Sequence, residues 1–184
     1  FQTLLIWVIP VLLAITLHEA AHGWTASKFG DHTARMMGRV TLNPVKHIDP
    51  VGTIIVPLAL LIMSTGFIFG WAKPVPINFN ALRSPKSGMI WVALAGPGAN
   101  LIMAIGWLFV AILSFNNNIP IMLKMAGAGI FINILLAVFN LLPIPPLDGS
   151  RVISALLPNP LAYKYNQLER FGFVILIGLM FVGG

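Results

Sequence analysis

The chain has 184 residues, of which 58% are hydrophobic and only 9% are charged. A soluble domain would carry charge on about a quarter of its residues, so the composition predicts a single membrane domain, residues 1–184. The absence of cysteine excludes disulfides and thiolate metal sites. The net charge of +6 does not indicate nucleic-acid binding, because the basic residues lie in the loops between apolar runs.

Five apolar stretches follow one another along the chain. The first, residues 3–27, is long enough to span a bilayer, and the second, residues 51–71, is interrupted by proline and glycine. The third covers residues 88–115 and the fourth residues 122–142. The fifth begins near Phe171 and is, within this chain, too short to cross about 30 Å of hydrocarbon. The pattern predicts a mainly α-helical membrane protein, a polytopic bundle of transmembrane helices.

Two polar inserts, residues 30–50 and 71–87, separate the first three apolar stretches. Within the first insert, residues 37–44 have the composition of a short strand closed by an Asn-Pro turn. Within the second, the alternating prolines of residues 71–78 allow only an edge strand or polyproline geometry. We therefore expect a small membrane-associated β-sheet in these inserts.

The placement of residues 51–71 can be argued from charge. If they cross the membrane once, the lysines and arginines divide 5 to 6 between the two sides. If they dip in and return, the division is 10 to 1, which the positive-inside rule favours. This predicts a re-entrant or hairpin segment and a cytoplasmic location for the end of the first helix. Labelling of Lys73 or Arg83 from the far side would contradict it.

The motif His18-Glu19-Ala20-Ala21-His22 lies inside the first apolar stretch. Histidines four apart on a helix share one face, one turn apart, so both rings can reach one metal ion. Ionisable groups are costly in hydrocarbon and usually functional there, which favours a metal site over two packed histidines. We expect Glu19 to be the general base for hydrolysis, with a third metal ligand or a buried salt bridge as its alternatives.

The two histidines need a third ligand, because a catalytic zinc site has three protein ligands and one open position. Two of the other carboxylates, Asp31 and Asp49, lie in a polar insert, and Glu169 lies in a polar linker. Asp148 alone follows directly from a spanning stretch, in a proline-rich break. We expect it to complete a site for one Zn²⁺ ion, rather than to form a helix-ending Asp-Gly turn.

Several other polar residues have two interpretations each. Asn100 and Asn140 can hold an oxyanion or the substrate backbone, or they can make hydrogen bonds between helices. The sequence does not decide between these roles. Gly96, Gly98 and Ala99 are expected to permit close helix approach. His32 and His47 are expected in a solvated loop, with a second metal site as a minor alternative.

Three motifs together resemble the site-2 protease family of intramembrane zinc metalloproteases, particularly its short prokaryotic members without a PDZ domain. They are His18 to His22, Leu94-Ala-Gly-Pro-Gly-Ala-Asn100, and Asn140-Leu-Leu-Pro-Ile-Pro-Pro-Leu-Asp148-Gly149. The first motif alone is moderately specific. The three in this order, on apolar segments, are strongly specific.

The resemblance implies that His18, His22 and Asp148 bind zinc, that Glu19 is the acid/base, and that Asn140 and Asn100 contact substrate. It implies an endopeptidase that cuts transmembrane segments of other proteins, often after a first protease. Such an enzyme is a multi-pass protein of the cell membrane whose site opens toward the cytoplasm. Its partners are the substrate and the lipid bilayer, not nucleic acid, and homo-oligomerisation is left open.

Two other classes of function can be weighed against a protease. A zinc transporter also uses intramembrane histidines and carboxylates, but it needs ligands along a path, and this chain has one cluster. A catalytically silent scaffold is less favoured because the motifs are intact. For a protease, a substrate helix must partly unwind, and an edge strand at residues 71–78 or near Val40 could pair with the freed backbone.

Overall fold

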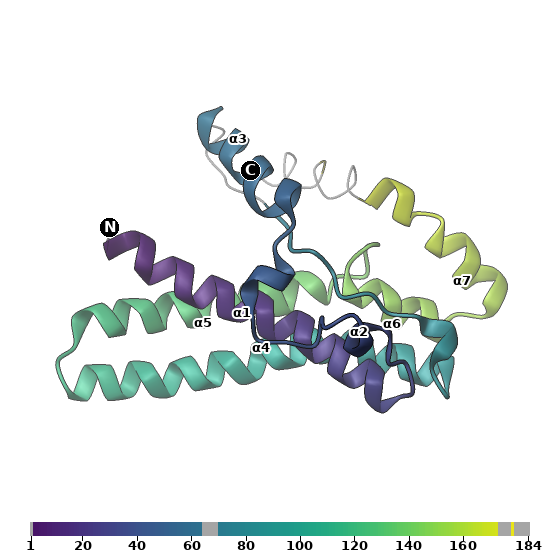
Figure 1. The fold of residues 1–184 in the computed structure, drawn as a ribbon, viewed down its shortest axis with the longest axis horizontal. Helices are drawn as coiled ribbons and strands as arrows, with labels where there is room; N and C mark the ends of the chain where they lie inside the picture. Colours follow the sequence, from purple (N-terminus) through teal and green to yellow (C-terminus); the bar gives the residue numbers. More distant parts are fainter. Residues whose placement is uncertain (1, 64–69, 173–177, 179–184) are drawn as a thin grey trace.

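The chain is a mainly helical membrane protein in the computed structural model, which describes residues 2–63, 70–172 and 178. Among the described residues, three helices are long and apolar enough to cross a membrane: α1 (Gln2–Lys28), α4 (Pro85–Asn116) and α5 (Pro120–Asn140) (Figure 1). Shorter helical elements are α2 (Thr33–Met36), η1 (Pro44–His47), η2 (Pro50–Ile55), α3 (Val56–Ile62), η3 (Phe79–Ala81), α6 (Asp148–Leu156) and α7 (Asn159–Asn166).

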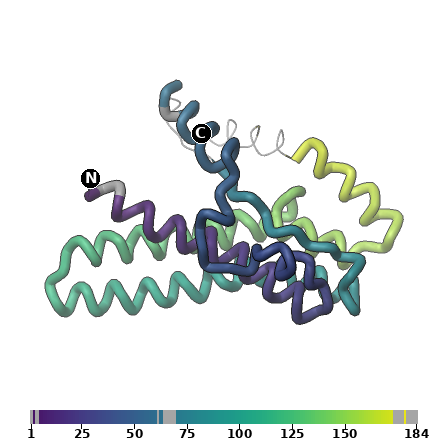
Figure 2. The backbone as a smooth tube through the Cα atoms, in the orientation of Figure 1, coloured from purple at the N-terminus to yellow at the C-terminus, as the bar shows by residue number. Residues whose placement is uncertain are grey.

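Helices α4 and α5 form an antiparallel hairpin, and α1 packs against both (Figures 1 and 2). The hairpin turns at Asn118, whose φ of 54° lies in the left-handed region that asparagine tolerates. Pro120 then begins α5 at a position where its missing N–H costs nothing. This arrangement brings the end of α1, the start of α4 and the end of α5 to the same end of the bundle.

Small residues line the contacts between the three long helices, and large apolar residues face outward. Ile102, Phe109 and Phe131 are 72%, 63% and 57% exposed. The buried hydrophobic residues of α1, α4 and α5 are almost all alanine: Ala14, Ala20, Ala26, Ala93, Ala104, Ala126, Ala128 and Ala137, with Val92. Small residues let helix backbones approach closely, and an apolar exterior suits hydrocarbon rather than water.

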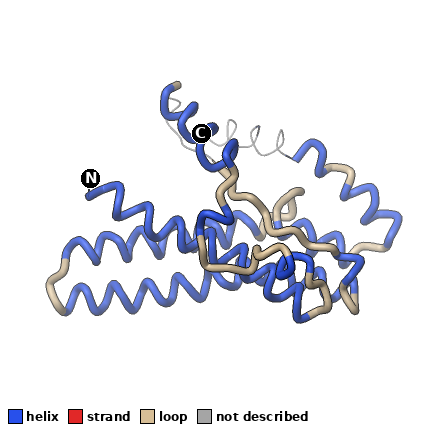
Figure 3. The backbone as a smooth tube through the Cα atoms, viewed as in Figure 1, coloured by secondary structure: helices blue, strands red, loops and turns tan. Residues whose placement is uncertain are grey.

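The expected β-sheet in the polar inserts is not found in the residues that the structure describes (Figure 3). Residues 37–38 form a turn in which Gly38 has a φ of 64°, and the chain then bends into η1. The strand prediction was wrong here because strand composition is a local signal. A ladder needs a partner strand, and none of the described residues supplies one.

Residues 70–78 are extended, but their backbone groups bond to loops and side chains instead of to a strand. The N–H of Lys73 donates to the carbonyl of His47 at 2.9 Å, and the N–H of Asn78 donates to Asp31 Oδ2 at 2.6 Å. Arg39 donates to the carbonyl of Lys73 at 2.9 Å. Because prolines at 74 and 76 have no N–H, this segment cannot form a regular ladder on its other edge.

The two ends of the second apolar stretch lie side by side. The N–H of Trp71 donates to the carbonyl of Gly52 at 3.1 Å, and Thr53 Oγ1 donates to the carbonyl of Trp71 at 2.8 Å. Element η2 runs directly into α3, and even together they are too short to cross a bilayer. The chain therefore returns at Trp71 to the point that it left at Gly52. The fifth apolar stretch, from Phe171, lies mostly outside the described residues.

Candidate metal centre

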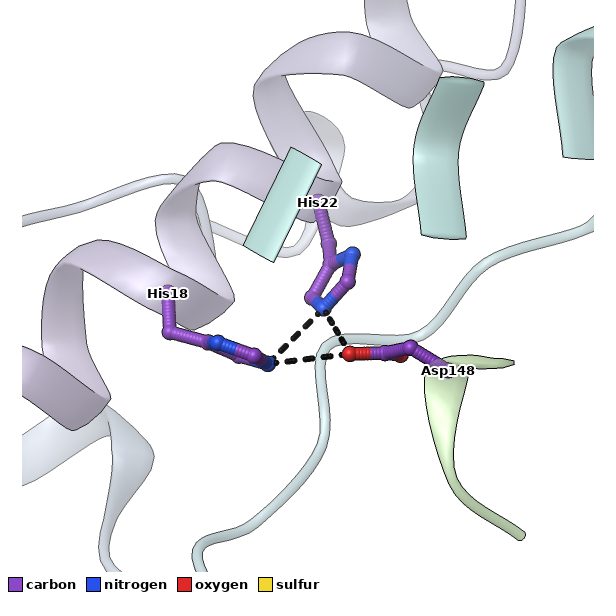
Figure 4. A group of neighbouring side chains, drawn as sticks. All are labelled: His18, His22 and Asp148. Atoms are coloured by element: carbon purple, nitrogen blue, oxygen red, sulfur yellow. Dashed lines mark hydrogen bonds and ion pairs between the residues drawn. The ribbon is translucent and has the colours of Figure 1, made fainter. Parts of the chain in front are cut away.

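His18 and His22 lie one turn apart on α1 and are 7% and 6% exposed. Their Nε2 atoms are 3.0 Å apart (Figure 4). Asp148, the first residue of α6, places its Oδ2 atom 3.2 Å from one Nε2 and 3.3 Å from the other. The structure thus brings together the three residues that the sequence analysis expects as ligands, from two elements far apart in the chain.

The outer nitrogen of each ring has its own acceptor. Nδ1 of His18 lies 2.5 Å from Oδ1 of Asn100, and Nδ1 of His22 lies 2.6 Å from the carbonyl oxygen of Val92. Because these oxygens can only accept, each Nδ1 carries the proton and each Nε2 presents a lone pair. The lone pairs of the two rings therefore face one another and the carboxylate of Asp148.

This convergence of three acceptors fits a metal ion. Asp148 Oδ2 is buried and has no hydrogen-bond donor in the part of the chain that the structure describes. Two imidazoles, one carboxylate and an open fourth position form a known donor set for catalytic zinc. Ligand atoms around a tetrahedral zinc, at about 2.0–2.1 Å from it, would be about 3.3 Å apart. The observed separations of 3.0, 3.2 and 3.3 Å are close to that value.

Gly96 of α4 leaves the space in which the two rings meet. A Cβ atom built at this position would lie 2.3 Å from His22 Nε2 and 2.6 Å from His18 Nε2. The expected close approach at Gly96 is therefore an approach of imidazoles to the α4 backbone. Gly98, two residues further along α4, has nothing within 4 Å of such an atom.

The position of Asp148 depends on how α6 meets the end of α5. A Cβ atom at Gly149 would lie 2.1 Å from the carbonyl oxygen of Leu141, so only glycine allows the first turn of α6 to approach this closely. At the other end of α6, Lys86 Nζ donates to the carbonyl of Leu157 at 3.0 Å. Contacts at both ends therefore hold α6, and with it Asp148, against the bundle.

Glu19 lies beside the histidine pair and is half-buried. Its Oε2 atom accepts a hydrogen bond of 2.7 Å from the backbone N–H of Val75. The extended segment 70–78 therefore reaches the candidate metal centre. Sequence reasoning did not anticipate this contact, because a backbone N–H leaves no signature in the sequence.

The two asparagines singled out from the sequence have different surroundings. Asn100 is fully buried, with Oδ1 at His18 and Nδ2 donating to Oδ1 of Asn133 at 2.9 Å. Asn140 donates to the carbonyl of Leu136 in its own helix at 2.9 Å. Asn133 was missed, although an amide in the middle of an apolar helix is a recognisable signal because it needs a partner there.

The remaining histidines lie outside the cluster. His32 is exposed, and Nε2 of the buried His47 lies 3.1 Å from the carbonyl oxygen of Thr41. Within the described part of the chain, one group of three histidine or carboxylate side chains has its potential metal-ligand atoms within 4.8 Å of one another. That group is His18, His22 and Asp148.

Comparison with known proteins identifies the family. Residues 114–182 match the sequence model of Peptidase family M50. The chain is 41% identical over 180 residues to "Putative zinc metalloprotease YwhC" of Bacillus subtilis, an alignment that covers 94% of this chain and 78% of that protein. The chain belongs to peptidase family M50. This is the site-2 protease family, so the resemblance drawn from the three motifs is confirmed.

Other relatives of this M50 chain are more distant. It is 28% identical over 169 residues to "Putative zinc metalloprotease Rip2" of Mycolicibacterium smegmatis, covering 92% of this chain and 64% of that protein. It is 24% identical over 163 residues to "Zinc metalloprotease MJ0392" of Methanocaldococcus jannaschii, covering 88% of this chain and 36% of that protein. No solved structure matches the chain. The M50 chain is a metalloendopeptidase of the site-2 type, as predicted.

Proposed function

We propose that this M50 peptidase is an intramembrane endopeptidase that uses one zinc ion to cut peptide bonds within transmembrane segments. The observation that carries the proposal is the buried meeting of His18 Nε2, His22 Nε2 and Asp148 Oδ2 within an apolar helix bundle. When bound, zinc would act as a Lewis acid and would activate water as a nucleophile at neutral pH. The relatives named as zinc metalloproteases support the choice of metal.

Neighbouring groups orient each of the three proposed ligand residues. The Val92 carbonyl holds His22, and the Asn100 side chain holds His18. Asp148 is held by the packing of α6 against α4 and by the close approach of Gly149 to Leu141. Because the ligand atoms lie within 3.3 Å of one another, one ion can contact all three.

We assign the role of general acid and base to Glu19. Its bond from Val75 fixes one carboxylate oxygen and so fixes the orientation of the group. The carboxylate can take a proton from the attacking water and deliver it to the amine that leaves. Glu19 is half-buried and is not one of the three residues whose ligand atoms converge.

Membrane placement follows from charge and from the ends of the second apolar stretch. Ten of the eleven lysines and arginines belong to one end of the bundle if residues 51–71 do not cross. The hydrogen bond between Trp71 and Gly52 supports such a hairpin. The positive-inside rule then makes this end cytoplasmic, and water reaches the site from that side. In this proposal the protein is a multi-pass membrane protein, and the three long helices of its described part span the bilayer.

Substrate pairing along residues 71–78 is restricted in this structure. The N–H groups of Trp71, Lys73 and Val75 already donate to Gly52, His47 and Glu19, respectively. The prolines at 74 and 76 remove donors from the opposite edge. In this structure the segment therefore orients Glu19. A substrate strand could pair with it only after these hydrogen bonds break.

The test is a combined metal and cleavage measurement on purified protein in lipid nanodiscs, with a model transmembrane substrate. We expect one zinc per chain in the wild type and in Glu19→Gln, with cleavage lost in the variant. Glu169→Gln is the matched control, because Glu169 pairs with Arg151 at the surface and should keep both properties. Cleavage by Glu19→Gln, or a wild type that binds no zinc, would refute the proposal.

A further inference from the structure

Asn133 lies in the middle of α5, is fully buried, and has no role in the chemistry proposed above. Its Nδ2 donates to the carbonyl of Gly129 at 2.8 Å, and its Oδ1 accepts from Asn100 Nδ2 at 2.9 Å. Asn100 Oδ1 in turn lies 2.5 Å from Nδ1 of His18. A continuous chain of hydrogen bonds therefore crosses from α5 through α4 to a proposed metal ligand on α1.

The direction of each hydrogen bond in this series is set by the Gly129 carbonyl, at the end away from His18. The Gly129 carbonyl can only accept, so Asn133 must turn its NH₂ group toward it and its oxygen toward Asn100. Asn100 must then turn its NH₂ group toward Asn133 and its oxygen toward His18. The carbonyl of Ala14 acts in the same sense, but at 3.4 Å it is beyond the ordinary hydrogen-bond range.

The consequence for His18 is a single tautomer. Facing an oxygen that can only accept, its Nδ1 must carry the proton, and its Nε2 must carry the lone pair that faces Asp148. If the Asn100 amide turned over, its NH₂ group would face Nδ1. The proton would then move to Nε2 and block the ligand atom.

We propose that Asn133 is a positioning residue that fixes the tautomer and ring orientation of His18 through Asn100. The proposal rests on the proposed function in treating His18 as a ligand, but the tautomer itself needs no metal. Partners of this kind, one step removed from a ligand, are worth about 10- to 100-fold in metal affinity. A chain of neutral amides performs the task without burying another charge in hydrocarbon.

The two histidines differ in how they are held, and this difference supplies an internal control. Nδ1 of His22 bonds to the backbone carbonyl of Val92, an acceptor that cannot rotate and needs no further support. Loss of Asn133 should therefore disturb His18 and leave His22 unchanged. General loosening of the bundle would disturb both rings.

The first experiment measures tautomers in metal-free protein. Nitrogen-15 NMR of labelled histidine side chains, at a pH where the imidazoles are neutral, should show both wild-type rings protonated at Nδ1. In Asn133→Leu, we expect His18 to become a mixture of tautomers while His22 is unchanged. Asn117→Leu is the control, because Asn117 also donates to a carbonyl four residues earlier but lies at the far end of α4. It should leave both rings as in the wild type.

Two results would overturn the proposal. One is an unchanged His18 in Asn133→Leu. The other is an equal change of His18 and His22 in both Asn133→Leu and the less bulky Asn133→Ala, since Asn133 would then act through packing alone.

The second experiment measures zinc affinity by competition with a chelator. We expect Asn133→Leu to bind zinc about tenfold more weakly. Combining it with Asn100→Ala should add no further loss to that of Asn100→Ala alone, because Asn133 acts through Asn100. Additive losses would refute this route. A wild type that binds no zinc would instead refute the proposed function and leave the tautomer result intact.

Discussion

The backbone N–H of Val75 donates a 2.7 Å hydrogen bond to the carboxylate of Glu19. The contact joins the polar segment 70–78 to the helix that carries both histidines. It is reinforced nearby, since a Cβ atom on Gly23 would lie 3.0 Å from the Val75 side chain. The segment therefore lies directly against α1, beside the candidate metal centre.

Removing this N–H should impair catalysis without removing the metal. Val75→Pro deletes the donor within a segment that already contains Pro74 and Pro76, so an extended backbone is retained. We expect zinc binding to persist and kcat to fall about 10- to 100-fold. This loss is no larger than the loss expected from removing a general base altogether, because Glu19 is still present but less well oriented. Val75→Ala keeps the N–H and is the matched control. Equal rates for the two variants would argue that Val75 does not orient Glu19.

The space at Gly96 should be essential for metal binding. In Gly96→Ala the new methyl group would lie 2.3 Å from His22 Nε2, so at least one ring must leave its position. We expect zinc affinity to fall at least about 100-fold, because a ligand is displaced. Gly98→Ala changes the same helix where nothing lies within 4 Å, and should bind zinc normally. Zinc titration compares the two variants. Normal zinc binding by Gly96→Ala would show that the space at Gly96 is not needed for the two histidines to bind the metal.

The sequence predicts the three clustered side chains well, because both their residue types and their spacing indicate a metal site. His18 and His22 need only the helical repeat to share a face. Asp148 could be chosen because few carboxylates compete and it alone follows a spanning stretch. The structure brings these three together. The three described helices that are long enough to span a membrane could also be predicted from the sequence, since each is a long apolar run.

Other features depend on pairings that no local pattern encodes. The bond between Asn100 and Asn133 requires the register of α4 against α5, which small residues permit but do not specify. The Val75 contact uses a backbone group. The strand expected at residues 37–44 followed from composition alone, but sheet formation depends on a partner, and those residues form a turn and bends.

Asp31 should make stability depend on pH. It is 1% exposed and accepts bonds from Thr33 and from the N–H of Asn78. Burial alone would raise the pKa of the Asp31 carboxyl, but these hydrogen bonds and the nearby His32 bring the pKa below its usual 3.8. A lowered pKa stabilises the fold above the ordinary value, and that contribution disappears as the pH falls through the folded-state pKa.

Thermal unfolding in detergent at several pH values tests this contribution. We expect Asp31→Asn to be less stable than the wild type at neutral pH, by about 1–3 kcal/mol for the loss of charge-assisted bonds. The difference should shrink as the pH falls below about 4, where the carboxyl is protonated in the unfolded state, and should vanish below the lower pKa of the folded state. A difference that is constant with pH would show that the charge of Asp31 is not the stabilising feature.

The hairpin placement of residues 51–71 can be tested by cysteine labelling, because the chain has no cysteine of its own. Lys28, Lys73, Arg83 and Lys124 are all exposed and can be replaced one at a time. We expect Lys28→Cys, Lys73→Cys and Arg83→Cys to react with a membrane-impermeant reagent from one side of sealed vesicles.

Lys124→Cys is the control, since Lys124 follows the turn at the opposite end of the α4–α5 hairpin and should react only from the other side. The expected grouping follows from the bond between Trp71 and Gly52, which returns the chain to the side on which α1 ends. If Lys73→Cys and Arg83→Cys react together with Lys124→Cys, residues 51–71 cross the membrane. The start of α4 would then lie in the opposite leaflet from His22, which is incompatible with the hydrogen bond between His22 and Val92.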